Sequence, residues 1–355
     1  MNRFLCVFLL LSFLAGAQAQ KQQVTLLFAG DAMQHLPQIK AAYNGAGYEY
    51  DSCFYRIKEK IDSADIACVN LETVLSGKPY TGYPAFSAPD AFAEALKNTG
   101  FDVFFLANNH ALDKGQKGLE RTIDVLDSLG VKHTGTFKSP EARERYYPLM
   151  IIKNGIRIAF LNYVYGTNGL SVRPPNVINL IDTMQIKKDL ALTDLYRPDI
   201  IIANMHWGEE YKTLPSVQQK QLAEFLFLHG VRIVIGHHPH VVQPMVLERE
   251  GESIKHVVYY SMGNFISNQQ KVHTDGGMLA EVVISKEDDD SRVRIESYDY
   301  SLVWVRKFFQ NGKYRYVLLP SWKNQEDLTP EMTQEEKQKM NTFVTHAERI
   351  IRPEK

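Results

Sequence analysis

The stretch VRIVIGHHPH (231–240) runs from a strand-forming apolar segment directly into a glycine and three histidines, His237, His238 and His240. A buried strand that ends in a histidine cluster makes a poor core, because each imidazole loses hydration and must find partners. Neutral imidazole is, however, a common ligand of metal ions in proteins. The stretch therefore predicts a buried strand whose carboxyl end opens on a metal site, and other strands should bring further ligands.

Outward from this stretch, strand-like apolar runs alternate with helical patterns along the chain. Strands are expected at 24–33, 64–72, 101–110, 156–164, 199–208 and 231–240, and helices at 51–63, 90–100, 115–130, 182–195 and 216–230. Three further strands, with no helical pattern between them, are expected at 255–265, 276–285 and 292–300. The alternation predicts an α/β fold, and the helix-poor last third predicts a second sheet packed against the first.

Four more of the predicted strands end, as 231–240 does, in side chains that can bind a metal ion. Their ends read LLFAGDAMQH, IACVNLET, VFFLANNHALD and IIANMHWGEE. Ligands of open α/β sheets bind outside the carboxyl ends of the strands, so we expect these polar ends to converge. Imidazoles mixed with carboxylates and an amide suit zinc, manganese or iron better than calcium or magnesium. The candidate ligands, sufficient for two ions that share one bridging carboxylate, are Asp31, His35, Glu72, Asn109, His110, His206, His237, His238 and His240.

The ordered motifs GD…NLE…NNH…HWG…GHHPH…YSMGNF resemble those of the CapA family of capsule and poly-γ-glutamate synthesis proteins, over roughly Val24 to Ser267. That family belongs to the calcineurin-like metallophosphoesterase superfamily. The resemblance implies a four-layer α/β/β/α sandwich with two divalent metal ions. It implies either a hydrolase of phosphoesters or of the amide or ester bonds of a capsule polymer, or a non-catalytic subunit that binds an anionic polymer for export or attachment. A capsule-synthesis membrane complex is an expected partner.

The same resemblance assigns a role to each of these residues by position. Asp31 matches a ligand of the first metal, and Glu72 stands where a carboxylate bridges the two metals. His110 matches the catalytic histidine, which would donate a proton to the leaving group or hold a developing oxyanion. The remaining matched ligands are His240 at the first metal and Asn109, His206 and His238 at the second.

Two positions depart from the pattern of the wider superfamily. Its first motif reads D-x-H, whereas here Met33 stands two residues after Asp31, with His35 two further on. Methionine is a soft and weak ligand for these metals, so we expect His35 to be an additional ligand. Glu72 replaces a bridging aspartate and is one methylene longer. Both changes bear on which metal binds and on whether the centre is catalytic.

Residues around the predicted ligands are expected to support them or to contact a substrate. Asp113 should either orient His110 through a hydrogen bond or cap the helix that follows it. The H-x-H spacing puts His238 and His240 on one side of an extended segment, so His237 should point the other way as a support. Residues that either line a substrate cleft or pack in the core are Trp207, Tyr211, Asn264 and Phe265, with Tyr80 and Tyr83 on a loop that overhangs the metals.

Composition and the chain ends bound the class of protein. With 45% hydrophobic and 23% charged residues among 355, the composition is that of a globular protein. The net charge of −1 offers no basic surface, so no nucleic-acid partner is expected. Residues 1–19 resemble a signal peptide, with Arg3 before an apolar run and a cleavage site at Ala17-Gln18-Ala19.

We therefore expect an exported bacterial protein that lies in the periplasm or at the cell surface. Its main domain should span 20–325, followed by a C-terminal surface helix or tail at 326–355. An uncleaved N-terminal membrane anchor is the alternative to a cleaved signal peptide.

Two smaller features leave alternatives open. Cys53 and Cys68 remain after the signal peptide, and they form either a disulfide or two buried free thiols. The run KEDDDSR (286–292) predicts a solvated hairpin turn, and a carboxylate-rich metal loop is the alternative.

Overall fold

A computed structural model describes residues 22–287, 292–322 and 332–352 of the chain. The expected signal peptide, residues 288–291 of the KEDDDSR run and part of the expected tail lie outside the described residues. Within the described ranges, no helix is both long and apolar enough to cross a membrane.

Among the described residues, the strands form one 14-stranded hydrogen-bonded sheet that divides into two halves. The first half, called here the first sheet, contains β1 (Gln22–Ala32), β2 (Ile66–Leu71), β3 (Val103–Phe105), β4 (Lys132–Thr134), β13 (Asn264–Ile266), β14 (Gly276–Lys286), β15 (Arg294–Gln310) and β16 (Lys313–Pro320). The second sheet contains β6 (Leu149–Lys153), β7 (Ile156–Val164), β9 (Ile200–His206), β10 (Ile233–His237), β11 (Met245–Glu250) and β12 (Ser253–Tyr259). The two sheets are joined where Ile254 of β12 pairs with Ile295 of β15.

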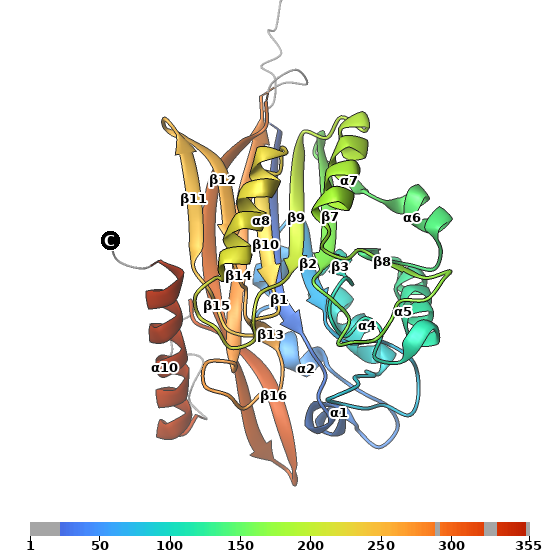
Figure 1. The fold of residues 1–355 in the computed structure, drawn as a ribbon. Coiled ribbons are helices and arrows are strands. Elements are labelled where there is room, and N and C mark those ends of the chain that lie inside the picture. The colour runs from blue at the N-terminus through green and yellow to red at the C-terminus, as the bar shows by residue number, and fades with distance from the viewer. Residues whose placement is uncertain (1–21, 288–291, 323–331, 353–355) are drawn as a thin grey trace, which may run out of the picture.

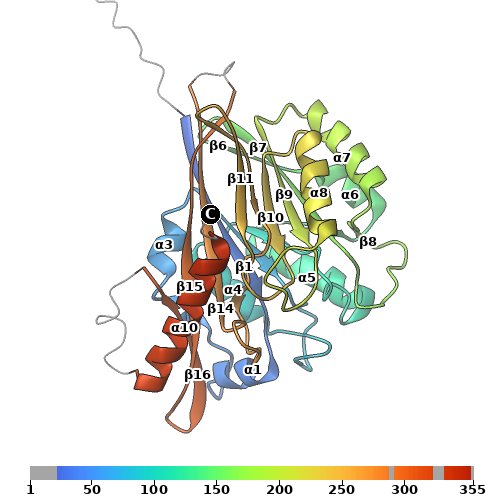
Figure 2. The same cartoon turned by 60° about the vertical axis from the view of Figure 1, so that its left-hand side comes forward.

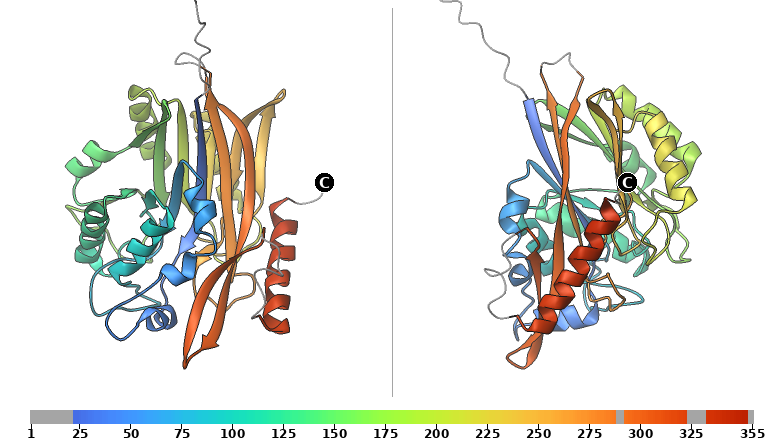
Figure 3. Two further views of the ribbon diagram at one scale, coloured as in Figure 1. Left: turned by 180° about the vertical axis from the view of Figure 1, so that it is seen from behind. Right: turned by 90° about the vertical axis from the view of Figure 1, so that its left-hand side faces the viewer.

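Helices cover the outer face of each sheet (Figures 1 and 3). The first sheet carries α1 (Leu36–Ala42), α2 (Asp51–Phe54), α3 (Lys58–Asp62), α4 (Asp90–Thr99) and α5 (Gly115–Leu129). The second sheet carries α6 (Pro140–Tyr146), α7 (Thr183–Leu195) and α8 (Val217–Leu228). A short two-stranded sheet of β5 (Thr136–Phe137) and β8 (Val177–Ile178) lies apart from the main path.

Alternation along each strand divides the apolar residues among three clusters. In β7, Ile158 and Phe160 belong to the cluster between the two sheets, whereas Leu161 packs with the helices outside. Phe160 lies 6.2 Å, between ring centroids, from Phe105 of the first sheet. Successive side chains of a strand point to opposite faces, so both faces of each sheet are covered. Three apolar interfaces make four layers, and the predicted α/β/β/α sandwich is confirmed.

Two helical regions differ from what the sequence pattern predicts. The helix expected at 51–63 is interrupted after Phe54 and continues as α3. The expected C-terminal surface helix forms as α10 (Gln334–Ile351), which crosses the first sheet in Figure 2. One side of α10 is buried, because its apolar residues Met340, Phe343, Ala347 and Ile351 join the cluster between the sheets.

The two cysteines are free thiols. Cys53 lies on α2 in the cluster under the outer helices, and Cys68 lies on β2 in the cluster between the sheets. The first sheet therefore separates them, and the disulfide alternative is wrong.

Candidate metal centre

The carboxyl ends of β1, β2, β9 and β10 bring the predicted ligands together between the two sheets. Asp31 lies at the end of β1, directly after a register shift between Ala29 and Asp31. Gly30 at this irregularity lies against the backbone of Gly263, and a Cβ there would be 2.1 Å from the Gly263 carbonyl oxygen. Only glycine permits this close approach. It lets β1 pair with β13 and places Asp31 beside Asn264.

Asp31 is a fully buried carboxylate that accepts hydrogen bonds from both sheets. Its Oδ1 accepts from Asn70 Nδ2 at 2.8 Å and from His237 Nδ1 at 3.1 Å. Its Oδ2 accepts from His240 Nδ1 at 3.1 Å and from the His238 backbone at 3.3 Å. Burial alone would raise the pKa of Asp31, but the hydrogen bonds and charges of His237 and His240 hold that pKa well below its usual range. Asp31 is therefore an anion at neutral pH.

Glu72 has the opposite surroundings, because neither of its buried carboxylate oxygens has a hydrogen-bond partner among the described residues. Its Oε1 lies 3.8 Å from His206 Nε2, 3.8 Å from His240 Nε2 and 3.9 Å from His110 Nε2. Burial, and then the charge of Asp31, raise the pKa of Glu72 well above its usual range. An unpaired buried carboxylate is costly, and a divalent cation held between it and the imidazoles would remove that cost. The residues present therefore fit a metal ion.

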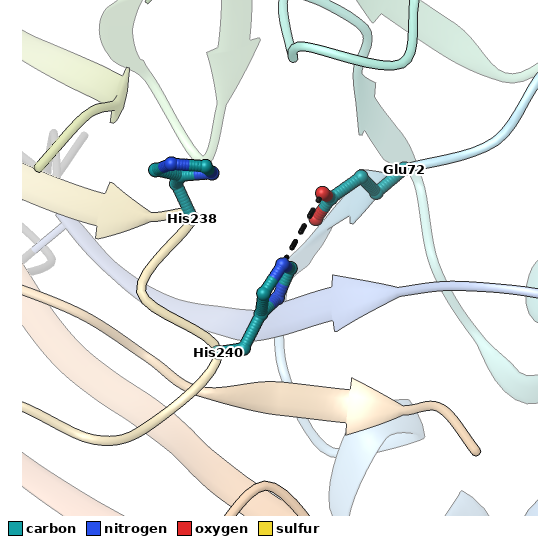
Figure 4. Close-up of side chains that lie close together, drawn as sticks. All are labelled: Glu72, His238 and His240. Atoms are coloured by element: carbon teal, nitrogen blue, oxygen red, sulfur yellow. Dashed lines mark ion pairs between the residues drawn. The ribbon is translucent and has the colours of Figure 1, made fainter. Parts of the chain in front are cut away.

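Among the described residues, two overlapping groups of side chains could hold an ion, and Glu72 belongs to both. One contains Glu72, His238 and His240, which converge in Figure 4. The other contains Asp31, Glu72 and His206. In each group the ligand atoms lie within 4.8 Å of one another. The resemblance pairs the histidines differently, with His240 beside Asp31 and His238 beside His206. Because Glu72 belongs to both groups, it lies where one carboxylate could bridge two metal ions.

Two imidazoles of the centre, those of His206 and His238, are held as neutral ligands. Burial, and then the charge of His238, lower the pKa of His206 well below its usual range. Burial, and then the charge of His240, lower the pKa of His238 to about 3. His238 Nδ1 is buried without a hydrogen-bond partner in the described structure. His240 Nδ1 faces the oxygens of Asp31 and Asn264 at 3.1 Å each, so the proton is on Nδ1 and the Nε2 lone pair points toward Glu72.

The backbone of the HHPH segment differs from the extended conformation that the sequence predicts. Strand β10 ends at His237, and the next two histidines turn the chain with φ of +97° at His238 and +59° at His240. Positive φ is strained for residues with a Cβ and recurs at functional sites. The rings of His238 and His240 nevertheless lie 5.8 Å apart between centroids. His237 points elsewhere, with both ring nitrogens facing the oxygens of Asp31 and Asn204, so it supports Asp31.

His110 and Asp113 form a pair beside the ligands. His110 Nδ1 lies 2.8 Å from Asp113 Oδ2, and this oxygen also accepts from the Phe86 backbone at 2.6 Å. Helix α5 has Lys114 as its N-cap, so Asp113 is not the cap of that helix. Asp113 holds the proton on His110 Nδ1 and turns Nε2 toward Glu72.

Comparison with known proteins places these residues in a family. The sequence profile described as "Bacterial capsule synthesis protein PGA_cap" matches residues 25–269. The chain belongs to this family. The matched span runs from β1 to just beyond β13 and contains every residue of the centre described above.

Curated relatives carry capsule-related names. The chain is 26% identical over 274 residues to the capsule biosynthesis protein CapA of Bacillus anthracis, covering 74% of this chain and 64% of the relative. It is 29% identical over 196 residues to the PGA biosynthesis protein CapA of Bacillus subtilis, covering 54% of this chain and 50% of the relative. The alignments thus span about half to two thirds of these relatives. Among solved structures, the NAD nucleotidase of Haemophilus influenzae superposes with a TM-score of 0.49 at 13% identity, covering 92% of this chain and 63% of that chain.

The two remaining ligand candidates, Asn109 and His35, differ in their distance from the other ligands. Asn109 Oδ1 lies 2.9 Å from His206 Nε2, a spacing typical of two atoms that bind one ion. His35 belongs to neither group of potential ligands among the described residues. It is the N-cap of α1, its Nδ1 accepts from the Asn268 backbone at 3.3 Å, and burial lowers its pKa to about 4. His35 therefore lies outside both groups of potential ligands.

The predicted cleft residues divide between the rim and the core. The ring of Tyr211 lies 6.1 Å from that of His240, and Asn264 accepts from His240 Nδ1, so both border the centre. Trp207 does not line a cleft: it is 2% exposed and its indole N–H donates to the Tyr260 carbonyl. Phe265 is also a core residue, with its ring stacked on Phe54. Both rings are buried in the apolar clusters between a sheet and its outer helices. On the overhanging loop, Tyr80 packs against Tyr48, and the exposed Tyr83 lies against Phe86.

Three residues of the centre are missed by the sequence analysis. Asn70 and Asn204 each lie two positions before a predicted ligand on the same strand face, and they bind Asp31 and His237. Tyr165 follows β7, and its ring lies 4.6 Å from that of His238. Each had a signal in the sequence. The alternation of a strand places residues i and i−2 together, and IRIAFLNYV is a sixth strand that ends at the same edge.

Proposed function

We propose that this protein is an exported hydrolase that uses two divalent metal ions, manganese, zinc or iron, at the centre between its sheets. Its substrates are phosphoesters or the amide or ester bonds of an anionic capsule polymer. The observation that carries the proposal is the buried carboxylate of Glu72, without a hydrogen-bond partner in the described structure and surrounded at 3.8–3.9 Å by three imidazole nitrogens. Perturbed pKa values and costly polar clusters gather at functional sites.

The metal ions would be held by side chains from both sheets. When bound, they supply Lewis acidity for the substrate oxygen and lower the pKa of a coordinated water. The residues that hold them in this proposal are Asp31, Glu72, Asn109, His206, His238 and His240.

His110 supplies the proton that the leaving group needs. Its Nε2 faces the centre while Asp113 accepts from Nδ1, so the ring is fixed in orientation and in tautomer. A carboxylate beside Nδ1 also stabilises the imidazolium from which Nε2 donates. Without Asp113, the ring of His110 would be free to rotate away from Glu72.

The rim favours an anionic substrate. Lys271 Nζ lies 3.5 Å from the centroid of the Tyr211 ring, and that ring borders His240. An ammonium group held at this position attracts phosphate or carboxylate groups to the metals. Tyr165 is exposed and its ring lies close to that of His238.

A second function, binding of an anionic polymer without hydrolysis, is favoured by two observations. Met33 and Glu72 depart from the superfamily pattern at the first metal and at the bridge. One relative, 26% identical over 204 residues, is named a probable polyglutamine synthesis accessory protein of Mycobacterium tuberculosis. In this alternative the same centre holds the polymer for a capsule-synthesis complex at the membrane.

A turnover screen separates the two functions. Manganese-loaded protein is assayed with p-nitrophenyl phosphate, bis(p-nitrophenyl) phosphate and poly-γ-glutamate. We expect hydrolysis of at least one, reduced about 10²- to 10⁴-fold in His110→Ala with its metal content retained. Turnover equal in wild type and His110→Ala would refute the catalytic role of His110. Saturable polymer binding with no turnover would establish the second function instead.

Export is tested on the protein as its own host makes it. N-terminal sequencing should find a mature chain that begins near Gln20, in the periplasmic or surface fraction. Retention of Met1 on a cytoplasmic protein would rule out export.

A further inference from the structure

A groove with an aromatic wall lies between α1 and the overhanging loop that carries Tyr80. Helix α1 directly follows β1, so the groove lies at the end of the sheets where the ligand strands end (Figure 1). Its volume is about 580 Å³, within the range of ligand pockets. The wall is formed by Tyr43, Tyr48 and Tyr80, with Pro79 beside them. Tyr43 is exposed and the other two tyrosines are half-buried, so ring surface is open to a ligand.

The tyrosines of this wall are held in place by their neighbours. Tyr43 and Tyr48 pair through an antiparallel β-bridge, and their ring centroids lie 5.4 Å apart. The ring of Tyr80 meets that of Tyr48 edge-on at 5.2 Å, and the Tyr43 hydroxyl donates to the Gly45 carbonyl at 2.8 Å. On the loop, a Cβ at Gly82 would lie 2.5 Å from the first backbone nitrogen of α1. Both sides of the groove are therefore fixed against each other, and a ligand has little to order.

The groove carries positive charge, and none of the described residues that line it is acidic. Lys40 on α1 and Lys78 on the loop line it, and both are exposed. Neither forms an ion pair with a described carboxylate. A third lysine, Lys313, lies at the edge, where its Nζ donates to the Tyr43 carbonyl at 2.9 Å. Positive charge beside open ring faces favours a ligand that carries negative charge.

Two acids close to the groove are already engaged. Asp90, whose charge reaches the aromatic wall, is paired with Arg121 at 2.7 Å. Glu49, next to Tyr48 in the chain, accepts from the Ser52 backbone at 2.9 Å and from the Ser52 hydroxyl at 2.8 Å. These carboxylates therefore do not neutralise the lysines of the groove.

One loop connects the groove to the metal centre. It carries Tyr80 in the groove and Phe86 further on, and the Phe86 ring lies 4.6 Å from that of His110 and 5.1 Å from that of His35. An extended chain covers at most about 3.6 Å per residue, so Tyr80 and Phe86 are separated by no more than about 22 Å. A polymer chain that lies in the groove is thus within reach of the metal centre.

We propose that this groove binds the sugar rings of an acidic polysaccharide, the class of polymer on which the metal centre acts. The C–H faces of the sugar rings pack on Tyr43 and Tyr80, and the anionic groups of the chain pair with Lys40 and Lys78. A γ-linked polyglutamate has the charges but no rings, so it would leave the aromatic wall unused. The inference rests on the proposed function, because it names the polymer class for the same centre.

Three tetramers separate the contribution of rings from that of charge. Tetragalacturonate has sugar rings and carboxylates, cellotetraose has rings without charge, and γ-linked tetraglutamate has carboxylates without rings. By isothermal titration of the full-length protein, with its metals removed by chelation and dialysis, we expect saturable binding of tetragalacturonate. The other two tetramers should bind about tenfold more weakly. Because the metals are absent, the groove is tested separately from hydrolysis, and an inactive centre would leave this result unchanged.

Variants locate the binding at the groove. Tyr80→Ala should weaken binding of tetragalacturonate about 3- to 10-fold, and Lys78→Gln about 2- to 5-fold. The matched controls, Tyr146→Ala on α6 and Lys188→Gln on α7, are exposed and should leave binding unchanged. Thermal unfolding without ligand checks that each variant is folded.

Three outcomes would overturn the proposal. The first is failure of tetragalacturonate to bind, and the second is binding that survives both Tyr80→Ala and Lys78→Gln. The third is binding of γ-linked tetraglutamate as tight as that of tetragalacturonate, which would show that the rings contribute nothing.

Discussion

The two sheets bring different chemistry to the metal centre. The first sheet contributes oxygen ligands, from Asp31 at the end of β1, Glu72 after β2 and Asn109 after β3. The second contributes imidazoles, from His206 at the end of β9 and from the segment after β10. The chain therefore builds the centre only when the two apolar inner faces pack against each other. Site formation is coupled to the sheet-on-sheet core.

The electrostatics of the two sides are complementary. On the first sheet, the charge of Asp31 adds to burial in raising the pKa of Glu72. On the second, the charge of His238 adds to burial in lowering the pKa of His206. A like neighbour on each side thus disfavours the charged form of Glu72 and of His206. Cations between the sheets would offset the repulsion between the Asp31 and Glu72 carboxylates, and they would bind the lone pairs of the imidazole nitrogens.

Removing the shared carboxylate should have the largest effect. Glu72→Gln keeps the shape of the side chain but removes the charge that both potential ligand groups use. We expect bound metal after dialysis, measured by elemental analysis, to fall to background, and hydrolysis to fall with it. His238→Ala removes a ligand from one group only and should retain more metal. Metal content in Glu72→Gln equal to wild type would contradict a bridging role.

Weakening the packing between the two sheets should have the next largest effect. Phe160→Ala empties a fully buried position that faces Phe105 across the sheet interface. We expect it to lower the free energy of unfolding by about 3–5 kcal/mol in urea titrations. The matched control is Leu161→Ala, which faces the outer helices. Both variants should lose stability, but only Phe160→Ala should also weaken metal binding. Equal metal affinity in the two variants would contradict the coupling between the sheet-on-sheet core and the metal centre.

The pH dependence of the metal-free protein should differ in sign between the two sides. The pKa of Glu72 is raised on folding, so its contribution to stability is present below pH about 4.5 and is lost as pH rises. The pKa of His238 is lowered to about 3, so its contribution is present above pH about 6.5 and is lost as pH falls. After chelation, Glu72→Gln should be more stable than wild type at pH about 7 and no more stable at pH about 4, with a difference of at most about 1.4 kcal/mol per pH unit.

Urea titrations at both pH values, with and without manganese, check this sign. Added metal should reverse the ranking at neutral pH, because only the wild type gains from binding. A chelated wild type as stable as Glu72→Gln at neutral pH would show that the Glu72 carboxylate carries no folding cost.

The sequence predicts the layers and most of the centre for a simple reason. Apolar runs that end in Asp, Asn or His identify strand ends, and parallel strands in neighbouring positions bring those ends together. The supporting residues are harder to predict. Asn70 and Asn204 look like ordinary strand residues, and it is the pairing of neighbouring strands within each sheet that places their amides beside Asp31 and His237. Trp207 shows the converse, because it lies within the HWG motif while its ring belongs to the core.

Asp113 should matter through His110 rather than through the metals. Asp113→Asn removes the charge that holds His110 Nδ1–H at 2.8 Å. We expect kcat to fall about 10- to 100-fold with the metal content unchanged, as for other partners of catalytic or ligand histidines. A loss of metal equal to the loss of kcat would assign Asp113 a structural role at the centre instead.

Tyr165 should give the smallest effect, and it tests the rim. Its ring lies 4.6 Å from that of His238, and burial, then the charges of Glu72 and Glu210, raise its pKa to about 12. The hydroxyl is therefore a neutral donor throughout the working pH range. Tyr165→Phe should raise KM for an anionic substrate about 2- to 10-fold and leave kcat unchanged. Tyr196→Phe, equally exposed at 47% but at the end of α7, is the control. A fall in kcat with KM unchanged would move Tyr165 from substrate binding to the reaction itself.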